Sequence, residues 1–274
     1  NGEEFISLCT ALGVDLTVDK IVLRRTKATY LDIDIDSVRM EVSFAPKKME
    51  KLKKFVHEWV GKRKATRHEL QQLGGKLSYA TCVIPQLAPF TQEVYTAQGK
   101  LKEQWHSIRI NAQLQADIHA VEDILNTFKG TSMITRAPAM FTIATDASGK
   151  VGCGGYWKET NQWFFLPWHE HHVKLYNLDQ ELSITWKELY AIIICAELFG
   201  AHWQGKTVTI LCDNLGAVQL LQEKRRSPIP EINDLLRKLI TIEAKHGMHI
   251  TAAHIPGKDN IVADAISRGK KKKA

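Results

Sequence analysis

The sequence contains few cysteines and no paired cysteine motif. Its 274 residues include five cysteines, and no two of them are spaced as Cys-x-x-Cys: Cys9, Cys82, Cys153, Cys195 and Cys212. An odd number of thiols without that spacing argues against a disulfide framework and against a structural zinc site. Cys195 and Cys212 lie within apolar runs, where a free thiol behaves as a small hydrophobic side chain. We therefore expect a reduced, intracellular protein.

The sequence also lacks a long apolar run. The longest, residues 189–198, is interrupted by Glu197 and is shorter than the roughly 20 residues that cross a bilayer. We expect no membrane partner, and we find no secretory segment at the start. Because the chain begins with Asn1, we expect a piece of a longer chain. A hydrophobic content of 44% favours a globular fold, and the length predicts about two domains.

Positive charge is concentrated in two places. The formal net charge is +7; residues 47–69 carry +6, the tail Lys270–Lys273 carries +4, and residues 136–269 are balanced. A dense basic stretch suits a polyanionic partner, although a solvated helical face gives the same pattern. The tail fits nuclear targeting, nucleic-acid binding or a solvated terminus.

The first half of the chain is predicted to be mainly helical after a few strands. Residues 1–44 are expected to form strands and turns, and residues 30–36 alternate strictly. That alternation would place Asp32, Asp34 and Asp36 on one strand face, either as a metal site or as a solvated edge. Helices are predicted from Pro46 to Gly61, from a capping box at Thr66, and over residues 114–128. Pro85 and Pro89 are expected to break the chain.

After Pro138 the pattern changes to β structure. Strands are predicted at residues 141–146, 151–157, 162–168, 207–213 and 249–254, and helices at 185–203, 214–222, 231–246 and 261–268. The order β-β-β-α-β-α-α-β-α predicts an α/β layer with a mixed sheet flanked by helices.

Four carboxylates lie at the ends of these elements. Asp146 and Asp213 each end a predicted strand, whereas Glu188 and Asp264 lie in helices. Ligands bind in the crevice at strand ends of an open α/β sheet. Converging carboxylates would repel one another unless a cation neutralised them, and all-oxygen ligands select Mg²⁺ or Mn²⁺. Taken alone, an Asp before a turn is usually a turn former, and a Glu in the first turn of a helix usually interacts with the helix dipole.

These motifs, taken in order, resemble one known family. Thr145-Asp-Ala-Ser148, Thr185-Trp-Lys-Glu-Leu189, Cys212-Asp-Asn214 and the run from His254 through Asn260 to Asp264 are similar to the ribonuclease H domain of retroelement reverse transcriptases, especially DIRS-type retrotransposons. The resemblance implies a ribonuclease H-like domain over residues 138–269.

The resemblance also implies a mechanism. Asp146, Glu188, Asp213 and Asp264 would bind two Mg²⁺ ions, with Mn²⁺ as an alternative, and His254 would assist proton transfer or product release. The substrate would be the RNA strand of an RNA–DNA hybrid, cut to leave 5′-phosphate and 3′-hydroxyl ends. Two metal ions suit this chemistry because one activates water and the other stabilises the leaving oxygen.

The first half is similar to the end of a reverse transcriptase polymerase. Residues 1–45 would close the palm, 46–95 would form thumb-like helices, 96–137 the connection, and 270–274 a basic tail. Asp32 stands where such elements usually have glycine. The paired-aspartate polymerase motif is absent from this chain, so the upstream palm and fingers would be its partner in the polyprotein.

Further residues are candidates for nucleic-acid contact. They are basic residues of the thumb-like segment and polar or basic residues near the carboxylates: Lys47, Lys51, Lys54, Lys62, Arg63, Ser148, Asn214, Arg225, Arg226 and Asn260. Backbone groups near Gly149 and Asn214 are candidates for recognising the RNA 2′-hydroxyl. The His-rich run at 168–172 lacks the spacing of a structural zinc site. Trp59, Trp186 and Trp203 fit helix faces better than a base-stacking platform.

Three functions therefore stay open. The first is a Mg²⁺-dependent ribonuclease H joined to a duplex-binding thumb and connection, acting on an RNA–DNA hybrid or a template–primer duplex. The second is a decayed or repurposed module that binds nucleic acid without cutting it. The third is a segment that positions the primer inside a full polymerase. Metal-dependent cleavage separates the first from the second.

Overall fold

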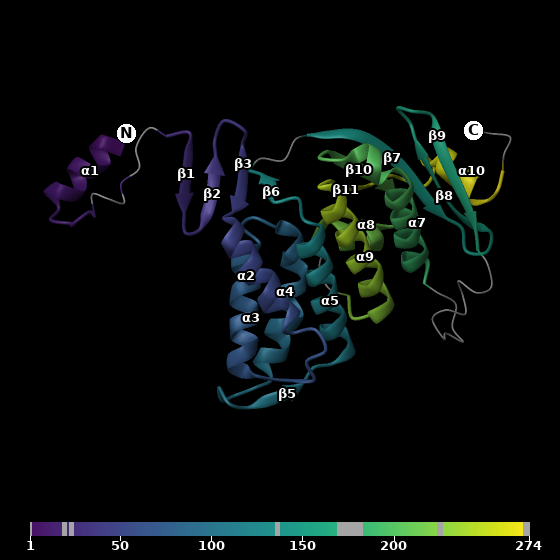
Figure 1. Ribbon diagram of the computed structural model, residues 1–274. Coiled ribbons are helices and arrows are strands. Elements are labelled where there is room, and N and C mark those ends of the chain that lie inside the picture. Colours follow the sequence, from purple (N-terminus) through teal and green to yellow (C-terminus); the bar gives the residue numbers. More distant parts are fainter. Residues whose placement is uncertain are drawn as a thin grey trace.

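The computed structural model describes residues 2–17, 21, 25–134, 138–168, 183–223 and 227–270. Arg225, Arg226, the His-rich run after Trp168 and most of the lysine tail lie outside these residues. Figure 1 shows a helical region beside a sheet domain, with a small sheet above the helices and helix α1 at the far end.

The N-terminal segment is helical where strands and turns were predicted. Helix α1 covers Gly2–Ala11. Glu3 and Glu4 lie in its first turn, where acidic side chains interact favourably with the helix dipole. Phe5, Leu8 and Leu12 recur at helical spacing and are all exposed. The prediction for residues 1–44 is therefore wrong at its start.

A small antiparallel sheet follows, and it corrects a second prediction. Its order is β1-β2-β3-β6, with β1 at Lys27–Tyr30, β2 at Ile33–Asp36, β3 at Glu41–Phe44 and β6 at Thr131–Met133. The single strand predicted over residues 30–36 is a hairpin in which Tyr30 pairs with Ile33. Leu31 and Asp32 form its turn with φ values of 48° and 63°. Asp32 therefore does not share a strand face with Asp34 and Asp36.

The helical region consists of four main helices and a short two-stranded ladder. Its elements are α2 (Pro46–His57), β4 (Lys64–Thr66), α3 (Arg67–Ala80), η2 (Pro85–Leu87), α4 (Ala88–Gly99), β5 (Ser107–Arg109) and α5 (Ala112–Thr127). The capping box is confirmed: Thr66 Oγ1 accepts from the Glu69 amide at 3.2 Å, and Glu69 accepts from the Thr66 amide at 2.7 Å. Sequence reasoning missed α4 because Pro89 lies in its first turn, where proline is tolerated, and does not break the chain.

The second half forms the expected mixed sheet. Its order is β11-β10-β7-β8-β9, with β7 at Ala139–Ala147, β8 at Gly152–Trp157, β9 at Gln162–Pro167, β10 at Thr207–Cys212 and β11 at His249–His254. β7, β10 and β11 are parallel, whereas β8 and β9 run antiparallel to their neighbours. This sheet, flanked by helices and preceded by a mainly helical region with a few strands, confirms the predicted fold class.

The helices of this half also follow the predicted order. They are α7 (Ile184–Phe199), η3 (Gly200–Trp203), α8 (Leu215–Glu223), α9 (Pro230–His246) and α10 (Ile261–Ser267). Side chains from α7, α8 and α9 join those of the strands in one buried core. Trp186 and Trp203 belong to this core, and Trp59 is buried in the helical region, as their helix spacing predicted. Among the described residues, no helix has both the length and the hydropathy to span a membrane.

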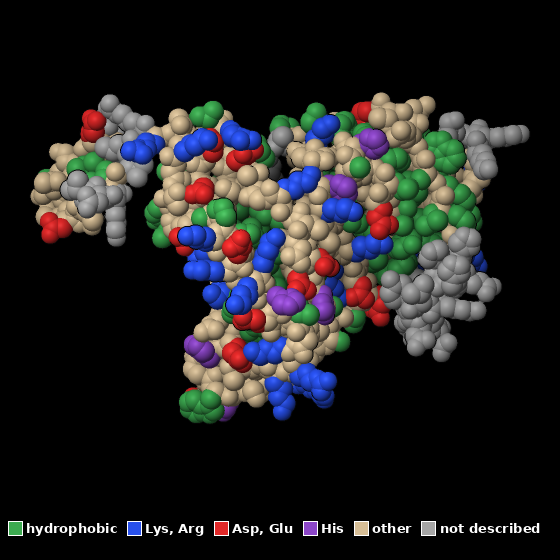
Figure 2. Space-filling view, in the orientation of Figure 1, with side chains coloured by type: hydrophobic (Ala, Val, Ile, Leu, Met, Phe, Trp, Pro, Cys, Tyr) green, Lys and Arg blue, Asp and Glu red, His purple; other side chains and the backbone are tan. Residues whose placement is uncertain are grey.

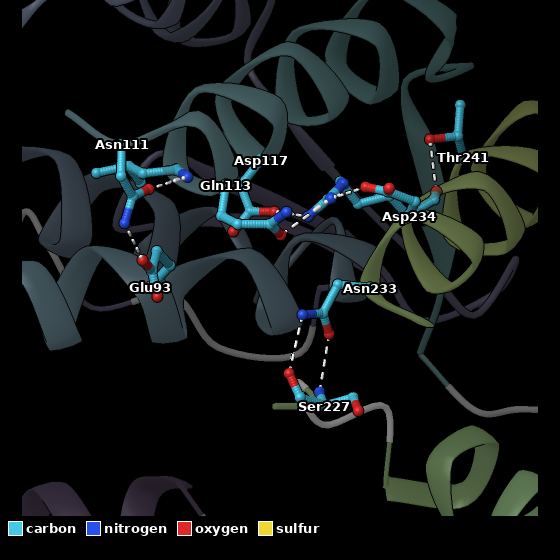
Figure 3. Close-up of polar contacts among 10 residues, drawn as sticks. Glu93, Asn111, Gln113, Asp117, Ser227, Asn233, Asp234 and Thr241 are labelled. Atoms are coloured by element: carbon cyan, nitrogen blue, oxygen red, sulfur yellow. Dashed lines mark hydrogen bonds and ion pairs between the residues drawn. The ribbon is translucent and has the colours of Figure 1, made fainter. Parts of the chain in front are cut away.

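Helix α9 joins the two halves. Leu235 and Leu239 pack in the core of the sheet domain, whereas Ile240 and Ala244 pack in the core of the helical region. Between α9 and α5, the buried Arg237 donates to Asp117 at 2.6 Å and to Gln113 at 3.2 Å (Figure 3). A buried charge needs such partners, and Arg237 also pairs with Asp234 of its own helix.

Candidate active site

Four structural elements bring the four predicted carboxylates together. Asp146 lies at the end of β7, and Asp213 follows β10, its parallel neighbour in the sheet. Parallel strands present their carboxyl ends at one edge, so these two side chains share it. Glu188 comes from α7, which begins after the N-cap Ser183. Asp264 comes from α10.

These side chains line one open cavity of about 390 Å³. Its other walls come from the turn after β7, the first residue of α7, the residue before α8 and the residue after α10. The lining residues are Asp146, Ala147, Ser148, Gly149, Ile184, Glu188, Asp213, Asn214, Asp264 and Arg268. Seven of the residues that the sequence singled out are in this set: Asp146, Ser148, Gly149, Glu188, Asp213, Asn214 and Asp264.

A glycine-rich strand lets α10 approach the sheet closely. Gly154 of β8 pairs with Asp146, and a Cβ atom at Gly154 would lie 2.4 Å from Ile266 Cγ2 on α10. Any larger residue would therefore displace the helix that carries Asp264. In the loop after β11, a Cβ atom at Gly257 would lie 3.1 Å from Asp213 Oδ2. The glycine therefore lets this loop lie close to the Asp213 carboxylate.

Hydrogen bonds fix two of the carboxylates. Asp146 is 5% exposed and accepts a short hydrogen bond from Ser267 Oγ, one turn after Asp264. Glu188 is 2% exposed; it accepts from the Ala147 amide at 3.2 Å and from Cys212 Sγ at 3.6 Å. Ser267 and Cys212 were not predicted as site residues, although Ser267 lies three residues after Asp264 on the same helix.

Burial and mutual repulsion change the acidity of the site. Burial raises the pKa of Glu188 to about 8, and the negative charges of Asp146 and Asp213 add to the effect. Burial also raises the pKa of Asp146, with further contributions from Asp213 and Asp264, whereas the Ser267 hydrogen bond opposes the rise. Such shifts mark a site where negative charge is incompletely compensated by the protein.

Arg268 is a cation at this site that sequence reasoning missed. Its Nε donates to Asp264 Oδ1 at 2.7 Å, and Arg268 lines the cavity. The ion pair with Asp264 raises the pKa of Arg268 above its ordinary value. The i, i+4 spacing of the two residues on one helix was the available signal. A guanidinium at the cavity wall is well suited to a phosphate oxygen.

The structure places His254 and Asn260 beside the cavity, not in its wall. His254 is exposed and is the last residue of β11. It pairs with Cys212, the residue before Asp213, so it lies one position along the strands from that carboxylate. Asn260 is 2% exposed, and its Nδ2 donates to the Thr145 carbonyl at 3.0 Å. That bond ties the start of α10 to β7, so Asn260 is placed to position Asp264.

Ser148 and Asn214 reach the cavity, but their side chains also hold local structure. Ser148 Oγ accepts from the Gly152 amide at 2.9 Å and from the Val151 amide at 3.0 Å, which closes the β7–β8 turn. Asn214 Oδ1 accepts from the Ala217 amide at 2.9 Å and caps α8. Lys187 Nζ donates to the Gly149 carbonyl at 2.6 Å and steadies the same turn.

The predicted basic contacts lie in the helical region, away from this cavity. Lys47, Lys51 and Lys54 are exposed on α2, and Arg63 is exposed just before β4. Lys62 is half-buried, pairs with Glu69 at 2.7 Å, and lies over the Trp59 ring at 4.8 Å. α2 therefore presents lysines to solvent, whereas Lys62 is engaged within the fold.

The donor set fits a hard divalent cation. Four carboxylates supply only oxygen ligands, as Mg²⁺ and Mn²⁺ prefer. Ligand atoms of Glu188, Cys212 and Asp213 lie within 4.8 Å of one another. Burial raises the pKa of the Cys212 thiol, and a hard cation prefers the carboxylate oxygens to sulfur.

No family model and no curated protein matches the sequence. Solved structures with some similarity include the foamy viral protease–reverse transcriptase in complex with double-stranded DNA, at 15% identity and a TM-score of 0.36; the match covers 92% of this chain and 42% of that one. LC11 RNase H1, isolated from compost by a metagenomic approach, is 20% identical over 46% of this chain and 91% of its own, with a TM-score of 0.35.

RNase H1 from the halophilic archaeon Halobacterium salinarum is 13% identical over 49% of this chain and 98% of its own, with a TM-score of 0.34. The match thus covers about two fifths of the foamy viral protein, and nearly all of the two RNase H1 proteins with just under half of this chain. Identities this low, with TM-scores below 0.5, leave the chemistry to be decided by the site itself.

Proposed function

We propose that residues 138–269 hydrolyse the RNA strand of RNA–DNA hybrids in a Mg²⁺-dependent reaction. The observation that carries this proposal is the convergence of Asp146, Glu188, Asp213 and Asp264 from four elements on one cavity. The raised pKa values of Asp146 and Glu188 support it, because a bound cation would relieve the repulsion that raises them. The ordered ribonuclease H-like motifs in the sequence point to the same chemistry.

The four carboxylates would hold two Mg²⁺ ions, and Mn²⁺ fits the same donors. When bound, such ions activate water and stabilise the charge that develops on the leaving oxygen. The residues around them have separate tasks. Ser267 orients the Asp146 carboxylate, and the Ala147 amide orients that of Glu188. Arg268 holds Asp264 and faces the cavity, where it would contact a phosphate of the substrate.

Recognition of the RNA strand would use groups at the cavity rim. The backbone near Gly149 and Asn214 lines the cavity and is placed to contact a 2′-hydroxyl, the group that distinguishes RNA from DNA. His254, exposed at the end of β11, would accept or donate a proton as product leaves. Asn260 would act indirectly, by holding α10 against β7.

We further propose that the chain is the C-terminal part of a retrotransposon reverse transcriptase. In this interpretation residues 1–45 close the palm, 46–95 form the thumb, and 96–137 form the connection. Exposed lysines on α2 would track the backbone of a hybrid or template–primer duplex. Phe5 and Leu8 on α1 and Leu12 just after it are between 56% and 69% exposed, which suits burial against upstream palm and fingers.

The test is incubation of the purified chain with an end-labelled RNA–DNA hybrid, with Mg²⁺ or with EDTA. We expect cutting of the RNA strand only with Mg²⁺, and a loss of at least about 100-fold in Asp213→Asn, because the site then has one carboxylate charge fewer to hold the cation. Asp34→Asn is the matched control, since Asp34 lies in β2 and outside the cavity. Binding of the uncut hybrid by each variant is measured in EDTA.

The outcomes separate the competing functions. Mg²⁺-dependent cutting that disappears in Asp213→Asn and persists in Asp34→Asn supports the enzyme and its site together. Binding of the hybrid without any cutting would contradict the enzyme and favour a decayed or repurposed binding module. Restored primer extension after adding an upstream palm would address the third function, a primer-positioning segment, independently of cleavage.

A further inference from the structure

An exposed tryptophan lies at the end of the helical region, far along the chain from the carboxylates. Trp105 is 73% exposed, the largest fraction among the large hydrophobic side chains that the structure describes. It lies between α4 and β5, in a segment that also contains Lys100 and Lys102. Tryptophan is enriched among the residues that contribute most to binding.

The backbone on both sides of Trp105 is fixed. The His106 amide donates to the Glu103 carbonyl at 3.1 Å, which closes a four-residue turn with Trp105 at its third position. The carbonyls on either side of Trp105 accept from the first turn of α3: His106 from the Arg67 amide at 2.9 Å and Gln104 from the His68 amide at 3.2 Å. The indole is therefore presented to solvent from a rigid base, which lowers the entropic cost of binding.

Side chains add to this support. Arg67 Nη1 donates to the Lys102 carbonyl at 2.5 Å. The His106 ring meets the Trp105 ring edge-on, with centroids 6.0 Å apart and planes at 84°. With 73% of its surface exposed, the indole still offers area for stacking by another planar group.

Two cations face each other next to this turn. In the β4–β5 ladder Lys64 pairs directly with Arg109. Their neighbours Ala65 and Ile108 contribute to the core of the helical region, so alternation places Lys64 and Arg109 on the solvent side. Like charges opposite one another destabilise an antiparallel pair, and a polyanion would relieve this cost.

The surroundings are basic. Among the described residues, no ion pair involves Lys64, Lys102 or Arg109, and Glu103 is the sole carboxylate between residues 100 and 110. Trp105 and Arg109 are four residues apart, so their Cα atoms lie within about 14 Å. Figure 2 shows a hydrophobic patch with Lys and Arg side chains beside it at the end where Figure 1 labels β5.

We propose that this surface, the Trp105 tip (Lys64, Lys102, Trp105 and Arg109), binds single-stranded nucleic acid. The indole stacks on an unpaired base, and Lys64 and Arg109 contact the adjacent phosphates. A single strand fits better than a duplex because the bases of a duplex are already stacked on each other. It also fits better than an acidic protein segment, because a nucleic acid carries one planar base for every phosphate, whereas planar side chains do not recur with each carboxylate of a peptide.

The experiment measures binding in EDTA, so it requires neither metal nor cleavage and is independent of the proposed ribonuclease activity. Fluorescence anisotropy follows the full chain binding two labelled strands of about 15 nucleotides, one of deoxythymidine and one of abasic sugar-phosphate. We expect Trp105→Ala to weaken binding of the deoxythymidine strand about tenfold and that of the abasic strand little. Trp105→Phe should retain most of the affinity.

Two controls make the result specific. Trp163→Ala removes a 52% exposed tryptophan from β9 and should leave both affinities unchanged. Replacing Lys64 and Arg109 together by glutamine should weaken binding of both strands and lower the salt dependence by about 1.4, at roughly 0.7 per phosphate contact. Thermal unfolding of each variant verifies that the fold is kept.

The proposal is overturned if folded Trp105→Ala binds the deoxythymidine strand as tightly as the unchanged protein. It is also overturned if that variant loses equal affinity for both strands, since stacking on a base would then not be involved.

Discussion

The two halves of the molecule each contain a group of acidic residues, and the two groups behave in opposite ways. In the β1–β2 hairpin every aspartate has its own partner: Asp32 pairs with Lys48 at 3.0 Å, Asp34 accepts from Thr29 Oγ1 at 2.6 Å, and Asp36 pairs with Lys27 at 3.1 Å. The Arg39 amide and the Lys27 ammonium lower the pKa of Asp36. At the carboxylate cavity, burial and neighbouring charges instead raise the pKa values of Asp146 and Glu188.

The difference shows what distinguishes a cation site from an acidic surface. Both groups have acids close together, and in the sequence the aspartates of the hairpin are spaced more closely than the carboxylates of the cavity. Only the cavity group combines burial with convergence of several carboxylates on one space, and among the described residues that line the cavity Arg268, beside Asp264, is the one lysine or arginine. Carboxylates that already have local partners gain little from a metal ion, whereas buried and crowded ones gain much.

The largest effect on the carboxylates of the cavity is expected from a substitution that displaces α10 from β8. We expect Gly154→Ala to lower the free energy of unfolding by a few kcal/mol, because its Cβ would meet Ile266 Cγ2 at 2.4 Å and the Phe164 carbonyl at 3.0 Å. Hybrid cleavage should fall as Asp264 moves. Urea unfolding at constant pH measures the change in stability.

A matched substitution in the other half should have the opposite sign. Gly75 lies in α3, and a Cβ there would meet no atom within 4 Å. Gly75→Ala should therefore raise stability by about 0.5–1 kcal/mol through the reduced entropy of the unfolded chain. Equal stabilities for the two variants would show that α10 can shift at no cost, and that its position does not depend on the glycine.

A smaller effect is expected from pH. The pKa of Glu188 is about 8 in the folded protein, against about 4.5 when unfolded. Between these values the folded state keeps a proton that the unfolded state has lost, so stability falls as pH rises from about 5 to 8. Glu188→Gln should flatten this dependence, and Mg²⁺ should reduce it by favouring the charged carboxylate. Thermal unfolding in EDTA across that range is the measurement.

The control for pH is a glutamate in the helical region. Glu58 is exposed at the end of α2, so Glu58→Gln should keep the full dependence. If Glu188→Gln left the pH dependence unaltered, the carboxylates at the cavity would be no more perturbed than those of the hairpin, and the contrast between the two groups would fail.

The sequence predicted the sheet domain better than the helical region for a physical reason. Strand alternation, caps and the Asp146-to-Asp264 motifs all point to one arrangement there, and the strand order places the acids together. The contacts of Ser267 with Asp146 and of Cys212 with Glu188 depend on tertiary packing, so the motifs did not reveal them. The pair of Arg268 and Asp264 is local, at i, i+4 spacing, and was missed although the sequence displays it. In the first half, the alternation over residues 30–36 gave no sign of a turn, because Leu31 and Asp32 adopt positive φ although neither is glycine. The start of α4 was missed because Pro89 was interpreted as a break in the chain.

The lysines on and after α2 differ in whether they are free to contact a nucleic acid. Lys51 and Lys54 are exposed, whereas Lys62 is already paired with Glu69. Replacing Lys51 and Lys54 by glutamine should weaken hybrid binding several-fold and lower its salt dependence by about 1 per lost phosphate contact. Lys62→Gln should change binding less. An unchanged salt dependence in the double variant would remove α2 from the binding surface.

The smallest effect is expected at the turn of the hairpin. Asp32 has a φ of 63° next to Leu31 at 48°, as in the two-residue turns that favour glycine. Asp32→Gly removes backbone strain of up to about 1 kcal/mol but also an exposed ion pair with Lys48 worth about 0–1 kcal/mol. The two changes should nearly cancel at low salt. At high salt the ion pair is screened, so the glycine variant should become the more stable protein.

Asp32→Asn separates the two contributions, since asparagine tolerates the left-handed region but carries no charge. It should be slightly less stable than the unchanged protein at low salt and equal to it at high salt, as followed by urea unfolding. A loss of more than about 2 kcal/mol in either variant would mean that the Asp32–Lys48 pair stabilises the fold far more than an exposed pair does. Asp32 would then not behave as a solvent-exposed acid. The difference between the exposed acids of the hairpin and the buried carboxylates of the cavity would rest on Asp34 and Asp36 alone.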